Sequence, residues 1–558
     1  MIIGLDVGGT HTDVVLLSEE GILREVKVPT DTAHLFHTVL KGLENITEGV
    51  DLQDVQRVVL STTLATNAII QHKIPEVGII VSSGPGIDAA HFKPNTFYYP
   101  VAGSIDHRGR EIASIDEDEI EAVGEELVQR GIRHLGVVGK FSVRNPSHEI
   151  RIQDILQNKF EKIFLGHRLS GNLNFPRRIA TAFLNASVYP IHKEFFTAVS
   201  DSLKAKGIDL PIRILKADGG NVKFESSIDF PGQTILSGPA ASVMGAVAFA
   251  PHDRETLVLD IGGTTTDMTV LVNGVPLLAP LGIDLGETKT LIRSMDVYSI
   301  GIGGDSLVRL GGEDIVIGPE RLGPAMAYGG PVPTPTDALF VLGRMENGNQ
   351  QKSIAGIAPI AAALNMTVEE TAEKIFDLTC QKILSEATAM VMRLNRKPVY
   401  TIYELQEGLR LNPKDILILG GPAPLFAERI KQLSAFEVRV IPKWSVANAM
   451  GAALARTTCE VALFADSEQG SLLAPGEDYS LAIQKNFTAQ DAIDIAYDLL
   501  KAKAIARGAN PGHLDMELIE NLQFNMVRGF STTGKNIRIR AQVRPGLIHG
   551  YERIIQPL

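Results

Sequence analysis

Two copies of one octapeptide carry residue types that suit phosphate binding. Residues 6–13 read DVGGTHTD and residues 260–267 read DIGGTTTD, and they agree at six of eight positions. Adjacent glycines allow a turn that brings backbone N–H groups up to an anion, and threonine hydroxyls add donors. The leading aspartates, Asp6 and Asp260, place carboxylates where they can hold Mg²⁺ or its water shell. The repeat therefore predicts a phosphate clamp with a metal side; a pair of tight Asp-Gly hairpin turns is the alternative.

Two further glycine segments suit other parts of a nucleotide. Residues 303–305 (GGD) end an apolar stretch, which predicts a helix start with Asp305 or Ser306 as the N-cap and free N–H groups facing an anion. Residues 420–422 (GGP) follow an apolar run that indicates a buried strand, and glycines there let a flat ring lie against the backbone. A glycine loop with a purely structural role is the alternative for each segment.

The elements around the octapeptides must hold these groups in place. Each copy lies between two apolar runs, 2–5 and 14–17 in the first and 257–259 and 268–272 in the second. This pattern predicts strand, glycine turn, strand in both copies, and hence a duplicated half-domain. Neither turn leads into a helix and no GxxxxGK[ST] segment occurs, so the sequence indicates neither a Walker loop nor a dinucleotide fingerprint.

Two stretches rich in small residues, 237–246 and 447–455, are predicted to be helices. Small side chains at this density allow two helices to approach closely, as a hinge between two lobes requires. A packed alanine-rich helix without a hinge role is the alternative reading of each.

Composition narrows the class of protein. The chain has 558 residues, with 53 Lys+Arg against 65 Asp+Glu and a net charge of −12, which is enough chain for several domains and argues against nucleic-acid binding. Two cysteines cannot form a disulfide framework, so a reducing compartment is expected. No apolar run reaches transmembrane length and the N-terminus does not read as a signal peptide, so we expect a cytoplasmic protein with no membrane partner.

The order of these segments resembles the actin, sugar-kinase and heat-shock ATPase superfamily over roughly residues 1–456. Four further segments resemble the hydantoinase/oxoprolinase family within it: 61–69, 141–149, 236–240 and 333–338. The resemblance implies an α/β, duplicated actin-like (ribonuclease H-like) two-lobe ATPase fold with a small C-terminal α+β domain. The expected divisions are a first lobe at 1–170, a second lobe at 171–456 and the C-terminal domain at 457–558.

The resemblance also implies ATP and Mg²⁺ as cofactors and a cyclic amide, such as a hydantoin, 5-oxoproline or a lactam, as substrate. Asp6 and Asp260 then hold Mg²⁺ and orient the attacking oxygen. The nucleotide is expected to contact Gly8, Gly9, Thr10, Thr12, Gly262, Gly263, Thr264, Thr265, Gly303, Gly304, Asp305, Gly420, Gly421 and Pro422. A kinase-like ligase that forms an acyl or aryl phosphate, and an ATP-driven switch for a partner protein, remain open as alternatives.

Substrate-binding residues are harder to identify. The candidates are Thr63, Asn67, Asn145 and Glu149, although both segments also read as ordinary helix starts. Only Glu149 could act as a base near neutral pH, so the site looks incomplete. We therefore expect an oligomer with a second hydantoinase-type subunit. Residues 324–330 contain no cysteine, where family members often carry one, which argues against a cysteine mechanism here.

The C-terminal hundred residues are predicted to form a small α+β domain. Strands are expected at 461–464, 479–483 and 537–543, and helical periodicity at 489–506 places Ile493, Ala496, Tyr497 and Leu500 on one face. Five basic residues between 528 and 544 read as a solvated face, with an anionic substrate or partner surface as the alternative.

Overall fold

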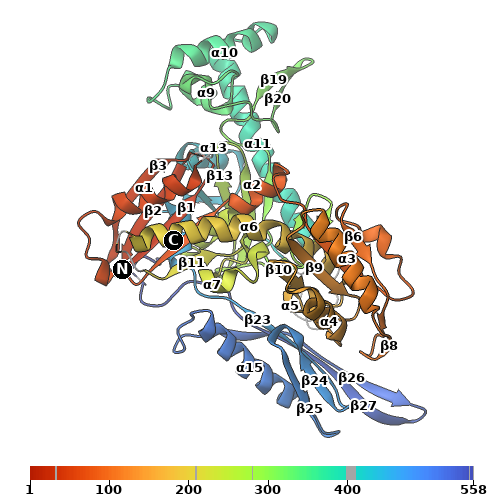
Figure 1. Ribbon diagram of the computed structural model, residues 1–558. Helices are drawn as coiled ribbons and strands as arrows, with labels where there is room; N and C mark the ends of the chain where they lie inside the picture. The colour runs from red at the N-terminus through yellow and green to blue at the C-terminus, as the bar shows by residue number, and fades with distance from the viewer. Residues whose placement is uncertain are drawn as a thin grey trace.

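The computed structural model (Figure 1) describes the whole chain except residues 10, 32, 33, 206, 208, 209, 280, 397–409, 552 and 557. The first sheet has the strand order β12-β11-β4-β1-β2-β3. Its strands are β1 (Ile2–Val7), β2 (His11–Ser18), β3 (Gly21–Pro29), β4 (Arg57–Thr62), β11 (Ile212–Leu215) and β12 (Asn221–Lys223). Every residue of β1 is buried, as expected for a central strand covered on both faces. The helices α1 (Leu35–Thr47) and α6 (Phe175–Ala205) pack on one of these faces.

The second sheet repeats this arrangement. Its order is β15-β14-β13-β21-β22, with β18 also paired to β14. The strands are β13 (Glu255–Ile261), β14 (Thr266–Val272), β15 (Val275–Pro276), β18 (Tyr298–Ile300), β21 (Asp415–Leu419) and β22 (Glu437–Val440). In both sheets the first strand pairs antiparallel with the next strand of its hairpin and parallel with a strand on its other side. The predicted strand, turn, strand units and the duplicated two-lobe α/β fold are therefore confirmed.

Two helices, α8 (Ser237–Val247) and α14 (Ala447–Leu454), lie between the sheets. Their residues form one apolar core with side chains from both sheets, such as Val59 of β4 and Val258 of β13. A Cβ atom on Gly451 would overlap the carbonyl oxygen of Ala241, so the two helices touch through their backbones. The predicted small-residue helices and their close approach are confirmed.

A parallel sheet of order β10-β9-β5-β6 is inserted between β4 and α6. Its elements and the adjoining short ones are α2 (Leu64–Ile70), β5 (Gly78–Ser82), β6 (Tyr98–Pro100), β7 (Ser104–Ile105), β8 (Glu111–Ala113), α3 (Glu117–Gln129), β9 (His134–Gly139), α4 (Ser147–Leu156), β10 (Lys162–Leu165) and α5 (Gly166–Leu169). The first sheet resumes after α6, because β11 pairs with β4 and β12 pairs with β11. The predicted lobe boundary at residue 170 is thus too early.

The second lobe carries a projection at the top of Figure 1, made of β19 (Val308–Gly311), β20 (Asp314–Ile317), α9 (Pro335–Val341), α10 (Gln350–Ala363) and part of α11 (Val368–Asn395). The helix predicted to start at Asp305 or Ser306 is wrong, since the chain enters the β19–β20 hairpin there. Alternating apolar residues and the Gly311-Gly312 turn favour a hairpin at this point. The remaining short elements are α7 (Phe224–Ser227), β16 (Asp284–Leu285) and β17 (Thr288–Lys289), and α13 (Ala423–Leu433) follows β21.

The C-terminal region forms a sheet of order β25-β24-β23-β27-β26 that lies along the lower side of the body in Figure 1. Its elements are β23 (Glu460–Asp466), β24 (Ser471–Ala474), β25 (Tyr479–Ala482), α15 (Ala489–Ala506), β26 (Met516–Arg528) and β27 (Ser531–Val543). Each predicted strand and the predicted helix are present, whereas β24 and β26 were not predicted. The last residues return to the body, where Tyr551 and Ile554 join the core around α14. Within the described residues, no helix is long and apolar enough to cross a membrane.

Candidate functional site

The two octapeptide turns have the same local geometry. Gly8 N–H donates to the carbonyl of His11 at 3.1 Å, and Gly262 N–H donates to the carbonyl of Thr265 at 2.9 Å. Asp6 and Asp260 each stand near the end of the strand that enters the turn, next to a strand that runs parallel to it. The carboxyl ends of these parallel strands therefore carry the two acids and their glycine turns.

Side chains from the two central helices connect the acids. Asn448 of α14 donates from Nδ2 to Asp6 Oδ2 at 3.3 Å, and its side chain lies close enough to Asp260 to lower the pKa of that carboxyl group. Ser242 of α8 donates to Asp260 Oδ2 at 2.5 Å. One amide side chain thus reaches both carboxylates, which come from opposite halves of the chain.

The surroundings of Asp6 suit a metal ligand better than a carboxylate with a purely structural role. Its side chain is 6% exposed, and its Oδ1 atom is buried without a hydrogen-bond partner among the described residues. An orphaned buried carboxylate oxygen is costly unless a cation or an ordered water satisfies it. The two carboxylates supply the hard oxygen ligands that Mg²⁺ prefers.

The carboxylates of the two turns all have raised pKa values. Burial, with the charge of Asp13 adding to it, raises the pKa of Asp6 to about 7. Burial and the charge of Asp260 raise the pKa of Asp267 to about 7. The pKa values of Asp13 and Asp260 are also raised, chiefly by burial. Clustered acids with few cations are typical of a functional site.

The second turn is covered by the 303–305 segment. Gly304 N–H donates to the carbonyl of Gly262 at 3.0 Å, and Asp305 N–H donates to that of Gly263 at 2.7 Å. A Cβ atom on Gly303 would lie 2.6 Å from both of those carbonyl oxygens, so only glycine allows this contact. These residues lie beside the phosphate turn as predicted, although they do not begin a helix.

The 333–338 segment holds this cover in place. Thr336 donates from N–H and from Oγ1 to the carbonyl of Gly304, at 2.8 and 2.7 Å. The buried Asp337 carboxylate accepts from the N–H groups of Met326 and Ala327, both at 2.9 Å, and from Ser353 at 2.6 Å. The 333–338 segment therefore links the 303–305 segment, which covers the second turn, to the 324–330 loop, which contains no cysteine.

The 420–422 segment lies directly beside Asp260. Gly420 has φ of +100°. A Cβ atom on it would come within 2.6 Å of Asp260 Oδ1. The strand β21 before it is fully buried and α13 begins just after Pro422, as the sequence predicted. Gly421 is exposed and has no atom near its Cβ position, so space is open above this loop.

The threonines of the two turns differ in accessibility. Thr264 is exposed and Thr265 is half-buried, so both stay candidates for phosphate contacts. Thr12 is fully buried, and its hydroxyl bonds Thr30 Oγ1 at 3.0 Å, so its predicted nucleotide role is wrong. Strand alternation turns this side chain away from the turn. Thr10 lies outside the described residues.

Two of the four substrate candidates lie beside Asp6. Thr63 N–H donates to the carbonyl of Val7 at 3.4 Å, immediately after the strand β4 that pairs with β1. Asn67, one helical turn later, donates to Thr63 Oγ1 at 3.1 Å. Both are half-buried. Their polar atoms can therefore reach a small molecule placed next to the first turn.

The other two candidates are structural, which corrects the prediction. Glu149 is fully buried and accepts hydrogen bonds from Gly139 N–H at 2.7 Å and from His167 Nδ1 at 2.5 Å. Burial raises its pKa, but the charges of His167 and Arg178 outweigh burial and hold it below its ordinary value. Asn145 accepts from the N–H of Ser147, the first residue of α4, at 3.0 Å and donates to the carbonyl of Gly109 at 2.9 Å. The polar atoms of both side chains are therefore committed to partners within the first lobe.

Asn448 and Ser242 were not identified from the sequence as site residues. Both lie in the small-residue helices, and Asn448 is the only polar residue in the 447–455 stretch. This single amide in an otherwise apolar helix was the sequence feature that could have identified Asn448 as a site residue. The closing acids Asp13 and Asp267 were visible as part of the repeat, but their raised pKa values depend on burial.

Comparison with known sequences gives the family. The sequence profile described as Hydantoinase/oxoprolinase matches residues 178–461, and the Hydantoinase/oxoprolinase N-terminal region matches residues 2–160. Caprolactamase subunit alpha of Pseudomonas jessenii is 24% identical, over 79% of this chain and 68% of its own length. Acetophenone carboxylase gamma subunit of Aromatoleum aromaticum is 25% identical, over 94% of this chain and 77% of its own.

Solved structures show the same fold. A nucleotide-free structure of acetone carboxylase aligns with a TM-score of 0.72 and 16% identity, over 99% of this chain and 88% of that one. The ATP-dependent caprolactamase from Pseudomonas jessenii also aligns with a TM-score of 0.72, at 19% identity and the same coverage. The chain belongs to the hydantoinase/oxoprolinase family.

Proposed function

We propose that this member of the hydantoinase/oxoprolinase family binds Mg²⁺-ATP between its two octapeptide turns and uses it to open a cyclic amide, such as a lactam, a hydantoin or 5-oxoproline. The observation that carries the proposal is the contact of one side chain, Asn448, with both Asp6 and Asp260. That contact supports a single site between the two octapeptide turns. The relative named as caprolactamase supports the substrate class, because its name refers to a lactam.

The proposed roles follow from position. Asp6 Oδ1 and the Asp260 carboxylate hold Mg²⁺, which neutralises phosphate charge when it is bound. The N–H groups of the two glycine turns and the hydroxyls of Thr264 and Thr265 contact the β- and γ-phosphates. The 420–422 loop is open above Gly421 and receives the adenosine end.

The chemistry depends on activating a poor electrophile. Transfer of the γ-phosphoryl group to the amide oxygen breaks the bond from phosphorus to ADP and forms a phosphorus–oxygen bond on the substrate. Water then adds to the activated carbon, and the ring C–N bond breaks as the nitrogen takes a proton. A second water releases phosphate from the resulting acyl phosphate and leaves a carboxylate. Thr63 and Asn67 orient the amide beside Asp6, since positioning and charge neutralisation dominate phosphoryl transfer.

A second subunit is proposed to complete the site. Glu149 was the one candidate base, and its carboxylate is committed to Gly139 and His167 inside the first lobe. Proton transfers during ring opening then need groups from another chain. The relatives named as an alpha and a gamma subunit support a multi-chain assembly.

The test is ATP hydrolysis measured across lactams, hydantoins, 5-oxoproline, carboxylic acids, and ketones with bicarbonate, with and without the product of the neighbouring gene. The expected result is slow, substrate-independent hydrolysis by the chain alone and coupled ring opening when the partner is added. Stoichiometric turnover only with a carboxylic acid would replace the proposal by a ligase. Coupled turnover by the chain alone would remove the need for a partner.

A further inference from the structure

A cavity of 480 Å³ lies between the C-terminal sheet and the two-lobed body. Its floor is the face of β27 that does not pack on α15. Ile537, Ile539 and Ala541 of that strand are buried in the core under α15, while Arg538 and Arg540 alternate with them and line the cavity. None of the octapeptide residues lines this space, so it is separate from the proposed nucleotide site.

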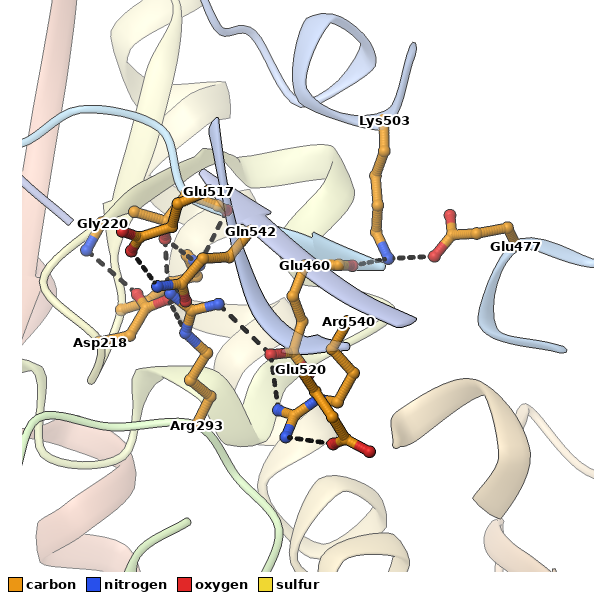
Figure 2. Close-up of polar contacts among 12 residues, drawn as sticks. Asp218, Gly220, Arg293, Glu460, Glu477, Lys503, Glu517, Glu520, Arg540 and Gln542 are labelled. Atoms are coloured by element: carbon orange, nitrogen blue, oxygen red, sulfur yellow. Dashed lines mark hydrogen bonds and ion pairs between the residues drawn. The ribbon is translucent and has the colours of Figure 1, made fainter. Parts of the chain in front are cut away.

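Most charges around the cavity are already matched by partners of the chain itself, as Figure 2 shows. Arg293 lies 3.1 Å from Asp218 and 3.4 Å from Glu460. Arg540 lies 3.1 Å from the same Glu460 and 3.9 Å from Glu520. These acids are therefore not free to receive a cationic ligand, and the positive charges of these two arginines are already matched by acids of the chain.

Two arginines that line the same cavity lack such partners. Arg144 is only 7% exposed, and neither it nor Arg538 makes a side-chain hydrogen bond or an ion pair within the part of the chain that the structure describes. The Nε atoms of both are buried and unpaired. Asp466, whose charge also acts on Arg144, accepts the N–H groups of Glu468 and Gln469 at 2.9 and 3.0 Å instead.

Arg144 is held in an orientation that leaves its donors free. Its guanidinium stacks on the ring of Phe464, 3.1 Å from the ring centroid. Stacking uses the flat face of a guanidinium, whereas its N–H groups point outward in the plane, where a carboxylate or phosphoryl group can accept two of them. Burial and the nearby charge of Arg538 lower the pKa of Arg144 to about 10, so the two cations oppose each other in this state.

We propose that this cavity is a binding site for a small organic anion, with its oxyanion group on Arg144 and Arg538 and its apolar body against Leu173, Leu277 and Ile519. An anion there satisfies one buried cation, Arg144, and one half-buried cation, Arg538, which otherwise repel each other and carry unpaired donors. The apolar wall selects an anion with a hydrocarbon part over inorganic phosphate. The site does not depend on the proposed catalytic function, because it uses none of those residues.

The test is isothermal titration calorimetry of the full chain with hexanoate, phenyl phosphate, inorganic phosphate and hexanol, at constant ionic strength. We expect hexanoate or phenyl phosphate to bind with a Kd of about 1 mM or tighter, inorganic phosphate to bind more weakly, and hexanol not to bind. Whether hexanoate or phenyl phosphate binds more tightly identifies the oxyanion. Arg538→Gln and Arg144→Gln should each weaken binding about tenfold or more, since charge-assisted hydrogen bonds are lost.

Arg528→Gln is the matched control, because Arg528 belongs to the same hairpin but is 64% exposed and pairs with Glu468. It should leave the affinity unchanged. If Arg144→Gln fails to fold, the Arg538 variant decides the question, since Arg538 is only half-buried. Absence of binding by both organic anions up to about 10 mM, or equal affinity of wild type and Arg538→Gln, would overturn the proposal.

Discussion

Carboxylates in two regions of this molecule have opposite electrostatic surroundings. At the two octapeptide turns, between which we propose the nucleotide cleft, burial raises the pKa of Asp6 to about 7, and no cation within the described residues pairs with it. At the junction of the body with the C-terminal sheet, the equally buried Asp218 has its pKa held at about 2, because Lys216 and Arg293 outweigh the effect of burial. Glu460, beside it in Figure 2, is likewise lowered by Arg540 and Arg293 against burial.

The difference separates structural acids from functional ones. Burial alone raises the pKa of any carboxylate, whereas neighbouring cations lower it. At the junction the fold provides such cations, and they keep the buried carboxylates ionised. Within the described residues, Asp13 is the one acid of the two turns with such a cation, Lys27, so a bound cation would relieve the repulsion among the others. A set of buried acids with few cationic partners is therefore a better indication of the site than burial or sequence pattern alone.

The largest expected effect is at the junction. Asp218→Asn leaves Lys216 and Arg293 buried without their acid and should lower the free energy of unfolding by about 3–5 kcal/mol, measured by chemical denaturation at pH 7. Asp253→Asn is the control, because that carboxylate is 74% exposed and pairs only with its neighbour Arg254. A loss below about 1 kcal/mol for Asp218→Asn would mean that the junction acid is not structural.

Replacing the cleft acids should lower activity without lowering stability. Asp6→Asn and Asp260→Asn should each lower Mg²⁺-ATP turnover by about 10² or more, because preorganised charge and metal placement dominate phosphoryl transfer. Their free energy of unfolding should not fall, since each change removes a charge that burial disfavours. Asp314→Asn, on the exposed β19–β20 hairpin, should change neither quantity. Turnover within a few-fold of wild type in both cleft variants would refute the assignment of the cleft.

The two regions should also respond to pH in opposite directions. The folded pKa of Asp218, about 2, lies below the ordinary value of 3.8, so its contribution to stability is present above pH 3.8. That contribution, about 2 kcal/mol, is lost as the pH falls toward 2. The folded pKa of Asp6 is raised to about 7, so its contribution is full below pH 3.8 and is lost as the pH rises to 7.

Denaturation of wild type, Asp218→Asn and Asp6→Asn at several pH values checks this expectation. The gap between wild type and Asp218→Asn should close as the pH is lowered from 4 to 2. The stability of Asp6→Asn relative to wild type should instead increase from pH 4 to 7. Parallel curves for all three proteins would contradict both assignments.

The smallest effect is expected at Lys27, a lysine that pairs with the cleft acid Asp13. Lys27 is 45% exposed and lies 2.5 Å from Asp13. Lys27→Met should lower the free energy of unfolding by less than about 1 kcal/mol, because solvent screens a half-exposed pair. It should also raise the pKa of Asp13 further, since Lys27 lowers it. A loss as large as that of Asp218→Asn would show that the cleft does rely on internal cations.

Much of the local structure was predictable from the sequence. The two octapeptide turns, the small-residue helices and the strand before Gly420 have short-range signals, namely apolar runs and glycine pairs. The prediction of a helix at residue 305 was wrong because Asp and Ser, which are common N-cap residues, are also common in the turn that leads into a hairpin. The edge strand β26 was missed because its outer residues are exposed and its pattern is interrupted by a register shift after Leu518.

The sequence by itself determined the family, the duplicated halves and the acids at the two turns, because each depends on residues that are neighbours along the chain. Only the tertiary structure decided which polar groups face the cleft. Thr12 and Glu149 are polar, but their side chains form hydrogen bonds with Thr30 and His167 away from the site. Asn448, in contrast, bonds Asp6, although the two residues lie far apart in the sequence. Such pairings are set by how helices and sheets pack, and a local pattern carries no information about a partner hundreds of residues away.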